Sequence, residues 1–410
     1  ANRSCLIVSS KETTLTVQPI RLLIVTRENE EDRAYGLGKT LQPVAEALQA
    51  RGHQVNYFCK SHCAPVHQKW HARFEKFVRP FAPAPAAGIA ERLVQGVAAA
   101  AQALISQATH VWVHDPWLAW GIQLGLLRRG VWQRPFKLIV SEHGMGSFAW
   151  AVTQDGVPLP DPLYRRLLAA ERRTLLHVDA VFSPSSVARD ALIRDLGLSS
   201  TPQHFQVMGY GRPELQLPNR LDTQHHFGIA TIPDRPSRPP VLLAVGRLSP
   251  VKRFDLLIDA AALLKERFQQ SVQIVIVGGG DPSLLLQQAA SLKLNPMPII
   301  RFEEDISKPL AVADIYISTC AVESYGQANR EALSAGIASI VPTGGGSGEV
   351  LGRGAKMVPL SVENLAVSIA ETLQTPEQQQ YWQRQALDES QRWPTWTQLA
   401  GHYEHIFTTL

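Results

Sequence analysis

The feature of this sequence that most constrains its fold is an alternation of short apolar runs with longer amphipathic stretches, which continues almost from end to end. Short apolar runs are typical of strands that are buried on both faces, and stretches with a period of 3.6 residues are typical of helices. The pattern therefore predicts parallel sheets covered by helices on both faces. The clearest helices lie at 41–50, 163–176 and 254–268, and the predicted strands lie at 20–25, 55–58, 110–114, 137–140, 180–182, 205–208, 241–245, 272–277, 299–302, 315–318, 338–341 and 355–358.

The alternation is interrupted once, by a polar and proline-rich stretch at residues 217–240. Proline lacks a backbone N–H and has a fixed φ, so this stretch disfavours a helix or a central strand. A chain of 410 residues is long enough for two domains. We expect two Rossmann-like, doubly wound domains that face each other across a cleft: a first domain at 1–216, a linker at 217–240, and a second domain at 241–389, with a C-terminal helix at about 390–410 that packs back on the first domain.

The composition excludes several classes of protein. The formal net charge of +4 is mild and no long block of Lys and Arg occurs, so we expect no nucleic-acid partner. Four cysteines are far too few for a disulfide scaffold in a chain of this length, which favours a cytoplasmic location. No apolar run approaches the roughly 18–20 residues of a membrane span.

The second half of the sequence carries four polar features at strand exits. In the first, Gly246 ends a predicted strand and is followed by Arg247 and Lys252, whose side chains can bind phosphate oxygens. In the second, the glycines at 278–280 follow an apolar strand and allow a ligand to approach the backbone. Either feature alone is equally typical of an ordinary surface loop.

The third and fourth features add carboxylates. Glu323 and Glu331 lie eight residues apart, and residues 324–329 between them can open a helix that offers free N–H groups to an anion. Carboxylates accept hydrogen bonds in pairs, which suits sugar and ribose hydroxyls. By spacing alone, two solvated glutamates on a surface helix are the simpler interpretation. The fourth feature is a glycine-rich loop that ends at Glu349.

In their order and spacing, these four features resemble the retaining glycosyltransferases of the GT-B fold, and most closely glycosyltransferase family 4. That family has a GR…K loop, an E-x7-E segment and a GG-x-x-E loop, which correspond here to residues 246–252, 323–331 and 345–349. The resemblance extends over about residues 20–410 and is strongest at 241–350. It implies that the second domain holds most of a nucleotide-sugar donor.

The resemblance also implies a role for each matching residue. Arg247 and Lys252 would hold the diphosphate and stabilise the leaving nucleotide, Glu323 would contact the donor sugar, and Glu331 would bind the ribose hydroxyls. His143 resembles the family's histidine near the donor sugar and the acceptor, although a structural histidine is the alternative. The other implied donor-binding residues are Gly36, Gly38, Gly246, Gly278, Arg301, Phe302, Glu303, Tyr325, Gly326 and Gln327.

The first half departs from known motifs at two points. Residues 38–40 look like the end of a Walker A loop, but Arg33 stands where that loop needs a glycine. The family's N-G-x-D motif, which follows the last strand of its first domain, is replaced here by Met208, Gly209, Tyr210 and Gly211. Because of Arg33, the glycines at 36 and 38 fit the family's glycine-rich loop better than a P-loop.

The activity implied by the resemblance is a retaining transfer of a hexosyl unit from a nucleotide-sugar, with UDP preferred on family frequency. The acceptor would be a saccharide, a lipid-linked molecule or a small molecule, in polysaccharide or glycolipid biosynthesis. In the same-face substitution of this family, the leaving diphosphate receives the proton of the acceptor, and no metal or other cofactor is expected. A phosphorylase or a nucleotide-sugar epimerase of the same fold is an alternative. So is a non-catalytic nucleotide-sugar-binding protein, against which the intact Arg247, Lys252, Glu323 and Glu331 argue.

One cluster in the first half invites a metal-binding interpretation. It consists of Cys59, His62, Cys63 and His67, whose residue types suit zinc. The paired knuckles of zinc modules are absent, so ordinary loop thiols are the default interpretation and we expect no metal site.

A second segment, at residues 67–79, carries three aromatic residues on one helical face with basic residues around them. Trp70, Phe74 and Phe77 could rest on an anionic membrane surface, which would place the protein at the inner face of the membrane. We favour the alternative that they pack on the core of the first domain.

Overall fold

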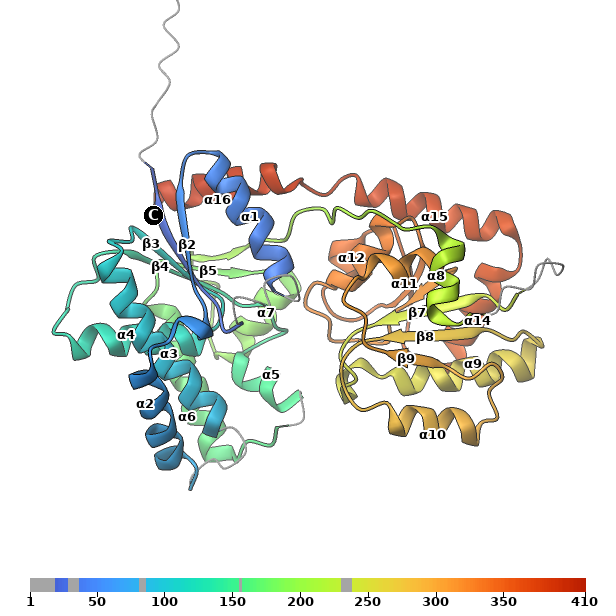
Figure 1. Ribbon diagram of the computed structural model, residues 1–410, viewed down its shortest axis with the longest axis horizontal. Coiled ribbons are helices and arrows are strands. Elements are labelled where there is room, and N and C mark those ends of the chain that lie inside the picture. The colour runs from blue at the N-terminus through green and yellow to red at the C-terminus, as the bar shows by residue number, and fades with distance from the viewer. Residues whose placement is uncertain (1–18, 29–36, 81–85, 155–156, 230–237) are drawn as a thin grey trace, which may run out of the picture.

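The computed structural model describes residues 19–28, 37–80, 86–154, 157–229 and 238–410 and shows two α/β domains that lie side by side (Figure 1). The first domain is built on a six-stranded parallel sheet with the order β2-β1-β3-β4-β5-β6. All six strands lie at the predicted apolar runs: β1 (Arg21–Val25), β2 (Gln54–Phe58), β3 (His110–Val113), β4 (Lys137–Ser141), β5 (Ala180–Ser183) and β6 (Phe205–Val207).

The second domain repeats this plan with the order β12-β11-β10-β7-β8-β9, again with every strand parallel. Its strands also coincide with the predicted runs: β7 (Val241–Val245), β8 (Gln273–Val277), β9 (Ile299–Arg301), β10 (Ile315–Ile317), β11 (Ala338–Pro342) and β12 (Lys356–Val358). The predicted fold class, two doubly wound parallel-sheet domains, is confirmed.

Helices cover both faces of the first sheet. The core on one face includes residues of α1 and α16, and the core on the other face includes residues of α3, α4 and α7. The helices that precede β6 are α1 (Gly38–Ala50), α2 (Pro65–Val78), α3 (Ala86–Ile105), α4 (Pro116–Arg128), α5 (Phe148–Gln154), α6 (Asp161–Leu176) and α7 (Ser186–Asp195), with a short 3-10 turn, η2 (Lys60–His62), before α2.

The second sheet is likewise covered on both faces. One core contains residues of α9 and α14, and the other contains residues of α8, α11 and α12. The helices after β6 are α8 (Arg220–Phe227), α9 (Phe254–Phe268), α10 (Ser283–Ser291), α11 (Ser307–Val312), α12 (Gln327–Ser334), α13 (Ser347–Leu351), α14 (Val362–Leu373), α15 (Pro376–Ser390) and α16 (Trp396–Thr409), with a second 3-10 turn, η3 (Pro250–Lys252), after β7.

Helix α8 corrects the prediction that prolines keep residues 217–240 free of helix. The Asn219 side chain accepts hydrogen bonds from the N–H groups of Leu221 and Asp222, and Gly228 ends the helix in a left-handed conformation. Phe227 is buried in the core of the second domain. The prolines of this stretch stand at 218 and from 233 onward, so residues 219–229 contain none and the helix can form.

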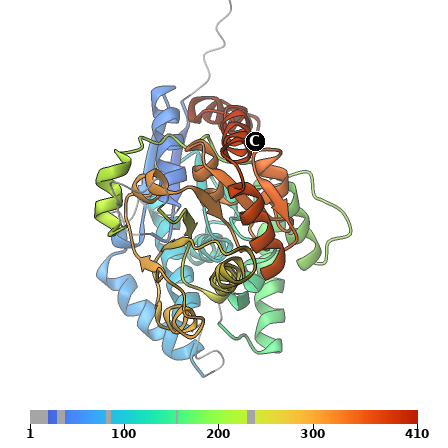
Figure 2. The same ribbon diagram turned by 90° about the vertical axis from the view of Figure 1, so that its right-hand side faces the viewer.

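The chain crosses between the domains twice. It first crosses after β6, and it returns after α15 to form α16, which packs beside α1 (Figures 1 and 2). Trp396, Tyr403 and Phe407 of α16 are buried in the core of the first domain. Every helix in the described segments is too short or too polar to span a lipid bilayer.

Candidate functional site

A cleft of about 610 Å³ lies between the domains, and residues that follow the carboxyl ends of strands in both sheets line it. Ligands of doubly wound sheets bind at this place. Eleven of the predicted site residues line the cleft: His143, Gly246, Arg247, Gly278, Phe302, Glu303, Glu323, Tyr325, Gly326, Gln327 and Glu331.

The other predicted site residues that the structure describes do not line it. Lys252 lines an adjoining cavity of about 190 Å³ that shares Gly246 and Glu323 with the cleft. Gly38 is buried at the start of α1, and the side chain of Arg301 points to α8. Gly36 lies outside the described residues.

The loops after β7 and β8 meet closely at two of the predicted glycines. A Cβ atom on Gly278 would lie 1.8 Å from the carbonyl oxygen of Gly246, so only glycine fits there. The loops are joined by hydrogen bonds from Gly246 N to Val277 O (2.9 Å) and from Leu248 N to Gly279 O (2.8 Å). This arrangement holds Arg247 at the cleft with an exposed side chain.

Lys252 and Glu323 form an ion pair. Lys252 Nζ donates to a carboxylate oxygen of Glu323 at 2.7 Å, and the Thr319 hydroxyl donates to Lys252 O at 2.5 Å. Burial lowers the pKa of Lys252, but Glu323 and Cys320 more than offset this, and the pKa stays above its ordinary value. Lys252 is therefore charged, with Glu323 as its counter-ion.

Helix α12 begins at the cleft and carries Glu331. Gly326 precedes the helix with a φ of +77°, and a Cβ atom there would meet the Asn329 side chain at 2.6 Å. Glu331 follows little more than one turn later and is 8% exposed. Burial raises the pKa of Glu331, while Lys39 on the opposite wall and Arg330 act in the other direction. The first turn of α12 and this carboxylate thus face the same cavity.

His143 stands between two partners in the first domain. Its Nδ1 lies 2.6 Å from the Tyr210 hydroxyl, and its Nε2 lies 2.9 Å from Nδ1 of His114. Burial lowers the pKa of His143 to about 4. Burial, followed by the neighbouring His143, also lowers the pKa of His114 well below its ordinary value. Both ring nitrogens of a neutral His143 are therefore engaged by the protein.

Among the cleft residues that the sequence analysis did not predict as site residues, Lys39 and Tyr210 have the clearest contacts. Lys39 lies in the first turn of α1, where its place directly after Gly38 was the available signal. Tyr210 occupies the variable position x of the family's N-G-x-D motif. Its backbone N–H donates to the Tyr325 hydroxyl at 2.9 Å, and its carbonyl accepts from Arg330 at 3.0 Å. The motif departs from the family pattern at the residues around Tyr210, but only the fold shows that Tyr210 contacts His143.

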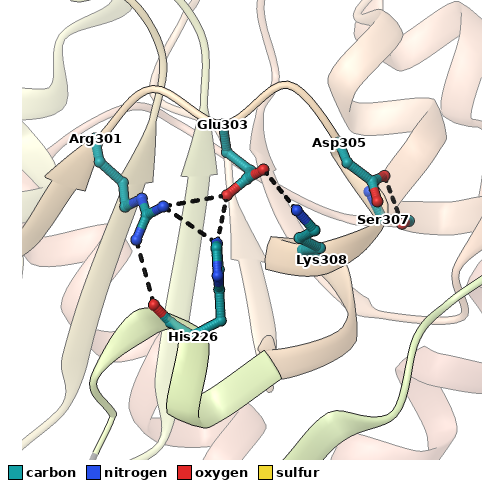
Figure 3. A network of polar contacts seen from close by, with 6 residues as sticks. All are labelled: His226, Arg301, Glu303, Asp305, Ser307 and Lys308. Carbon is teal, nitrogen blue, oxygen red and sulfur yellow. Dashed lines mark hydrogen bonds and ion pairs between the residues drawn. The ribbon is translucent and has the colours of Figure 1, made fainter. Parts of the chain in front are cut away.

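The loop after β9 is held by a polar network that Figure 3 shows. The carboxylate of Glu303 lies 2.7 Å from His226 Nε2, 3.2 Å from Lys308 Nζ and 3.4 Å from Arg301 Nη2. Burial raises the pKa of Glu303, but the hydrogen bonds from His226 and Lys308 outweigh it, so the pKa falls below its ordinary value. The network fixes the backbone on both sides of Phe302, whose ring is 61% exposed at the cleft.

The domains are also bonded to each other beside the cleft. The Glu349 carboxylate accepts from Ser186 N (2.9 Å), from the Ser186 hydroxyl (2.7 Å) and from Val187 N (3.2 Å), at the start of α7. The Ser185 hydroxyl donates to Ser324 O at 2.7 Å, and the Ser324 hydroxyl donates to His143 O at 2.6 Å. These bonds join the glycine-rich loop and the E-x7-E segment directly to the first domain.

The residues at 59–67, for which zinc was the alternative interpretation, do not form a cluster of metal ligands in the described part of the chain. Nowhere within it do three or more His, Cys, Asp or Glu side chains gather in a way that could hold a metal ion. Cys59 is buried, and its backbone N–H donates to His62 Nδ1 at 3.2 Å.

Comparison with known proteins places both domains in one group. Residues 35–210 match the glycosyl transferase 4-like domain, and residues 229–388 match the glycosyl transferases group 1 family. The mannosylfructose-phosphate synthase of Agrobacterium fabrum is 26% identical over 208 residues, which are 47% of this chain and 44% of that protein. The GDP-mannose-dependent alpha-mannosyltransferase of Mycobacterium tuberculosis is 28% identical over 177 residues, 42% of this chain and 44% of that protein. The matched segments thus span less than half of these relatives.

Solved structures support the same fold over nearly the whole chain. A sucrose-phosphate synthase from Thermosynechococcus elongatus superimposes with a TM-score of 0.71 at 17% identity, covering 95% of this chain and 98% of the other. HepE of Anabaena, in complex with UDP and glucose, has a TM-score of 0.68 at 16% identity and covers 95% and 100%. At identities as low as 16–17%, the likeness to these structures shows the fold alone.

Proposed function

We propose that this chain transfers a glycosyl unit from a nucleotide-sugar donor to a hydroxyl group of an acceptor. It belongs to the glycosyltransferases, because its first domain matches the glycosyl transferase 4-like domain and its second domain matches the glycosyl transferases group 1 family. The observation that carries the proposal is the cleft arrangement of Arg247, the Lys252–Glu323 pair and Glu331 beside the start of α12. Two cations suit a diphosphate, and two carboxylates suit hydroxyl groups.

We assign the diphosphate to Arg247 and Lys252. A diphosphate that reaches Lys252 competes with Glu323 for the ammonium group, because both are anions within reach of the same donor. Glu323 then becomes available to accept hydrogen bonds from hydroxyls of the sugar. Binding of the phosphate would in this way prepare the carboxylate that receives the sugar.

We propose a retaining, same-face reaction. As the bond from the sugar to the diphosphate breaks, negative charge grows on the leaving oxygen, and fixed cations nearby stabilise that charge more than they stabilise the bound donor. The leaving diphosphate accepts the proton of the acceptor hydroxyl, so no protein base is needed. His143, with both nitrogens engaged, serves in this scheme as a neutral wall of the sugar site.

We assign the nucleoside to the second domain, with the ribose on Glu331 and the base at residues 301–303. A UDP-hexose is our preferred donor. HepE of Anabaena is described in complex with UDP and glucose, whereas the Mycobacterium tuberculosis relative is named as GDP-mannose-dependent, so the base is the first property to test. A saccharide, lipid-linked or small-molecule acceptor in polysaccharide or glycolipid biosynthesis completes the proposal.

Helix α2 bears on the proposed contact with a membrane surface. Trp70 and Phe74 are half-buried; Phe74 packs on a core cluster of the first domain, and Trp70 lies under the guanidinium of Arg128 at 4.1 Å. Phe77 is 69% exposed. Packing within the first domain thus engages Phe74 through the core and Trp70 through Arg128, and we restrict the proposed membrane contact to the end of α2 around Phe77.

Calorimetric titration with UDP, GDP and ADP tests the donor site. We expect one nucleotide to bind to the wild type and Glu331→Ala to weaken that binding by about 1–3 kcal/mol, because a buried acceptor of ribose hydroxyls is lost. Glu266→Ala, on the exposed face of α9, is the matched control and should bind like the wild type. Failure of all three nucleotides to bind would refute the donor assignment.

A further inference from the structure

The first-domain wall of the cleft carries two cations that the donor assignment leaves unused. Arg27 follows β1 and Lys39 lies in the first turn of α1, and both residues line the cleft. Arg27 is exposed and Lys39 is half-buried. Within the ranges that the structure describes, neither side chain is held by a hydrogen bond or an ion pair. An exposed guanidinium that no carboxylate holds is available to an anionic ligand.

The carboxylate that acts most on Arg27 is engaged elsewhere. This carboxylate is Asp115, which is 3% exposed. One of its oxygens accepts from Arg92 Nε at 2.7 Å, and the other accepts from the backbone N–H groups of Trp117 at 2.8 Å and Leu118 at 3.3 Å. Asp115 therefore serves as the counter-ion of Arg92 and as the cap of α4, and it leaves the fork of Arg27 open.

Two further carboxylates act on Arg27, more weakly than Asp115, and both have other partners. Glu91 forms an ion pair with Lys60 at 2.8 Å. Glu28 accepts a hydrogen bond from the backbone N–H of Leu37 at 3.1 Å. The described carboxylates near Arg27 thus reduce the local positive potential, but none of them forms a direct pair with its guanidinium.

Arg92 adds a second guanidinium behind this wall. It is 7% exposed, and its guanidinium carbon lies 4.9 Å from the ring centre of Phe148, which lines the cleft. Burial and then Arg92 lower the pKa of Arg27, which means that the two positive charges repel each other. Both arginines remain charged near pH 7, so an anion bound at Arg27 would relieve this repulsion.

The order of the strands places Arg27 beside the proposed sugar site and away from the cations assigned to the diphosphate. Strand β1 pairs with β3, and β3 pairs with β4. Arg27 and His143 each lie two residues beyond the end of their strand, β1 and β4. Neighbouring strands are about 4.8 Å apart, so these two exits are separated by about 10 Å. The charges that act on the pKa of Arg27 all belong to the first domain.

We propose that the acceptor carries an anionic group, a phosphate or a carboxylate, which the guanidinium of Arg27 binds while Lys39 and Arg92 add positive charge. The proposal rests on the proposed glycosyl transfer, which requires an acceptor beside the sugar site. Phosphate and carboxylate share the pair of oxygens that a guanidinium fork fits, so the structure assigns the charge of the group and an experiment must distinguish its source.

Saturation-transfer NMR tests the anion site with glucose, mannose and galactose, each as the free sugar, the 6-phosphate and the uronic acid. Arg27→Gln removes the charge, and Arg172→Gln makes the same change at an exposed position of α6 outside the cleft lining. We expect at least one anionic form to bind to the wild type and to Arg172→Gln, and about tenfold more weakly to Arg27→Gln. Arg27→Lys should restore part of the affinity, because it keeps the charge but lacks the fork.

Three results would overturn the anion site. The free sugars could bind to the wild type as well as their anionic forms do, the anionic forms could bind equally well to Arg27→Gln, or no anionic form could bind to the wild type. If the site exists, the preference between the 6-phosphates and the uronic acids identifies the source of the charge.

Nucleotide calorimetry on the same proteins separates this test from that of the donor site. Arg27→Gln should bind nucleotide as the wild type does, and a matching loss of nucleotide affinity would assign Arg27 to the donor and overturn the proposal. The sugar probes are measured with and without saturating nucleotide. A protein that binds no nucleotide but still binds an anionic probe through Arg27 would refute the donor assignment and keep the anion site.

Discussion

Tyr210 stands where the first domain ends, and it contacts both sides of the cleft. Its hydroxyl meets His143, while its backbone is bonded to Tyr325 and Arg330 of the E-x7-E segment. The ring of Tyr210 packs edge-on against that of Tyr325 at 4.6 Å. Tyr210, at the variable position of the family's motif, thus ties His143 of the first domain to the E-x7-E segment of the second.

Titration of His143 by NMR tests its buried, engaged state. We expect its ring to stay neutral as the pH falls through the ordinary histidine value of 6.5, and to take up a proton only near its lowered pKa of about 4. Because the unfolded chain binds this proton at the higher pH, His143 lowers the free energy of unfolding as the pH falls from 6.5 towards 4.

A His143 signal that titrates near 6.5 would mean that the ring is solvated or paired with a carboxylate, and that the contacts with His114 and Tyr210 do not persist in solution.

At the scale of elements, α8 and the loop after β9 act as one unit. The helix forms inside a proline-rich stretch because Asn219 and Gly228 supply its two ends. Its last turn then places His226 against Glu303 and lets Arg301 bond back to His226 O (Figure 3). A helix that the sequence pattern disfavoured therefore supports the segment to which we assign the nucleobase.

Removal of one network member should change the preference for the nucleotide base. His226→Ala deletes the hydrogen bond to Glu303 but leaves Lys308 and Arg301 in place, so the loop loosens without loss of the fold. We expect nucleotide affinity to fall by about 1 kcal/mol and the difference between UDP, GDP and ADP to narrow in calorimetry.

His225→Ala is the matched control, since His225 is the exposed neighbour on the same helix. If the two variants show the same preference among the three nucleotides, the network does not position the base site. If His226→Ala unfolds at a much lower temperature than His225→Ala, its effect belongs to stability and the assignment of the base to this loop loses its support.

At the scale of the whole molecule, the contacts between the domains are concentrated near the ligand-binding loops. Glu349 reaches from the glycine-rich loop of the second domain to the start of α7 in the first, where free N–H groups favour an anion. Ser324 adds a bond to the backbone of His143 from within the E-x7-E segment. The relative position of the domains is thus coupled to the two loops that border the donor site.

Glu349→Ala should release this contact. Loss of the carboxylate removes charge-assisted hydrogen bonds. The free energy of the closed arrangement, relative to a more open one, should therefore rise by roughly 1.5–3 kcal/mol. Small-angle scattering of the nucleotide-free protein should show a larger radius of gyration than that of the wild type. Glu377→Ala, an exposed glutamate in the first turn of α15, should leave scattering unchanged. Identical curves for all three proteins would show that the Glu349 contact does not hold the domains together.

The sequence by itself determined the positions of the strands, and it predicted most of the second-domain residues that line the cleft. All twelve strands lie at the predicted apolar runs, because burial on both faces leaves a local signal in the chain. Arg247, Glu323 and Glu331 were predicted through the resemblance to the family, which rests on their spacing within short segments whose glycines mark strand exits. Such features are read over about ten residues and need no knowledge of the fold.

Only the tertiary structure decided what those residues face. The contact of Tyr210 with His143 spans 67 positions, and that of Glu349 with Ser186 spans 163. The effect of the Lys39 charge on the pKa of Glu331 likewise depends on how the two domains face each other. Sequence periodicity fixes which face of an element is buried, but it carries no information about which distant residue is opposite, and so these contacts could not be predicted from it.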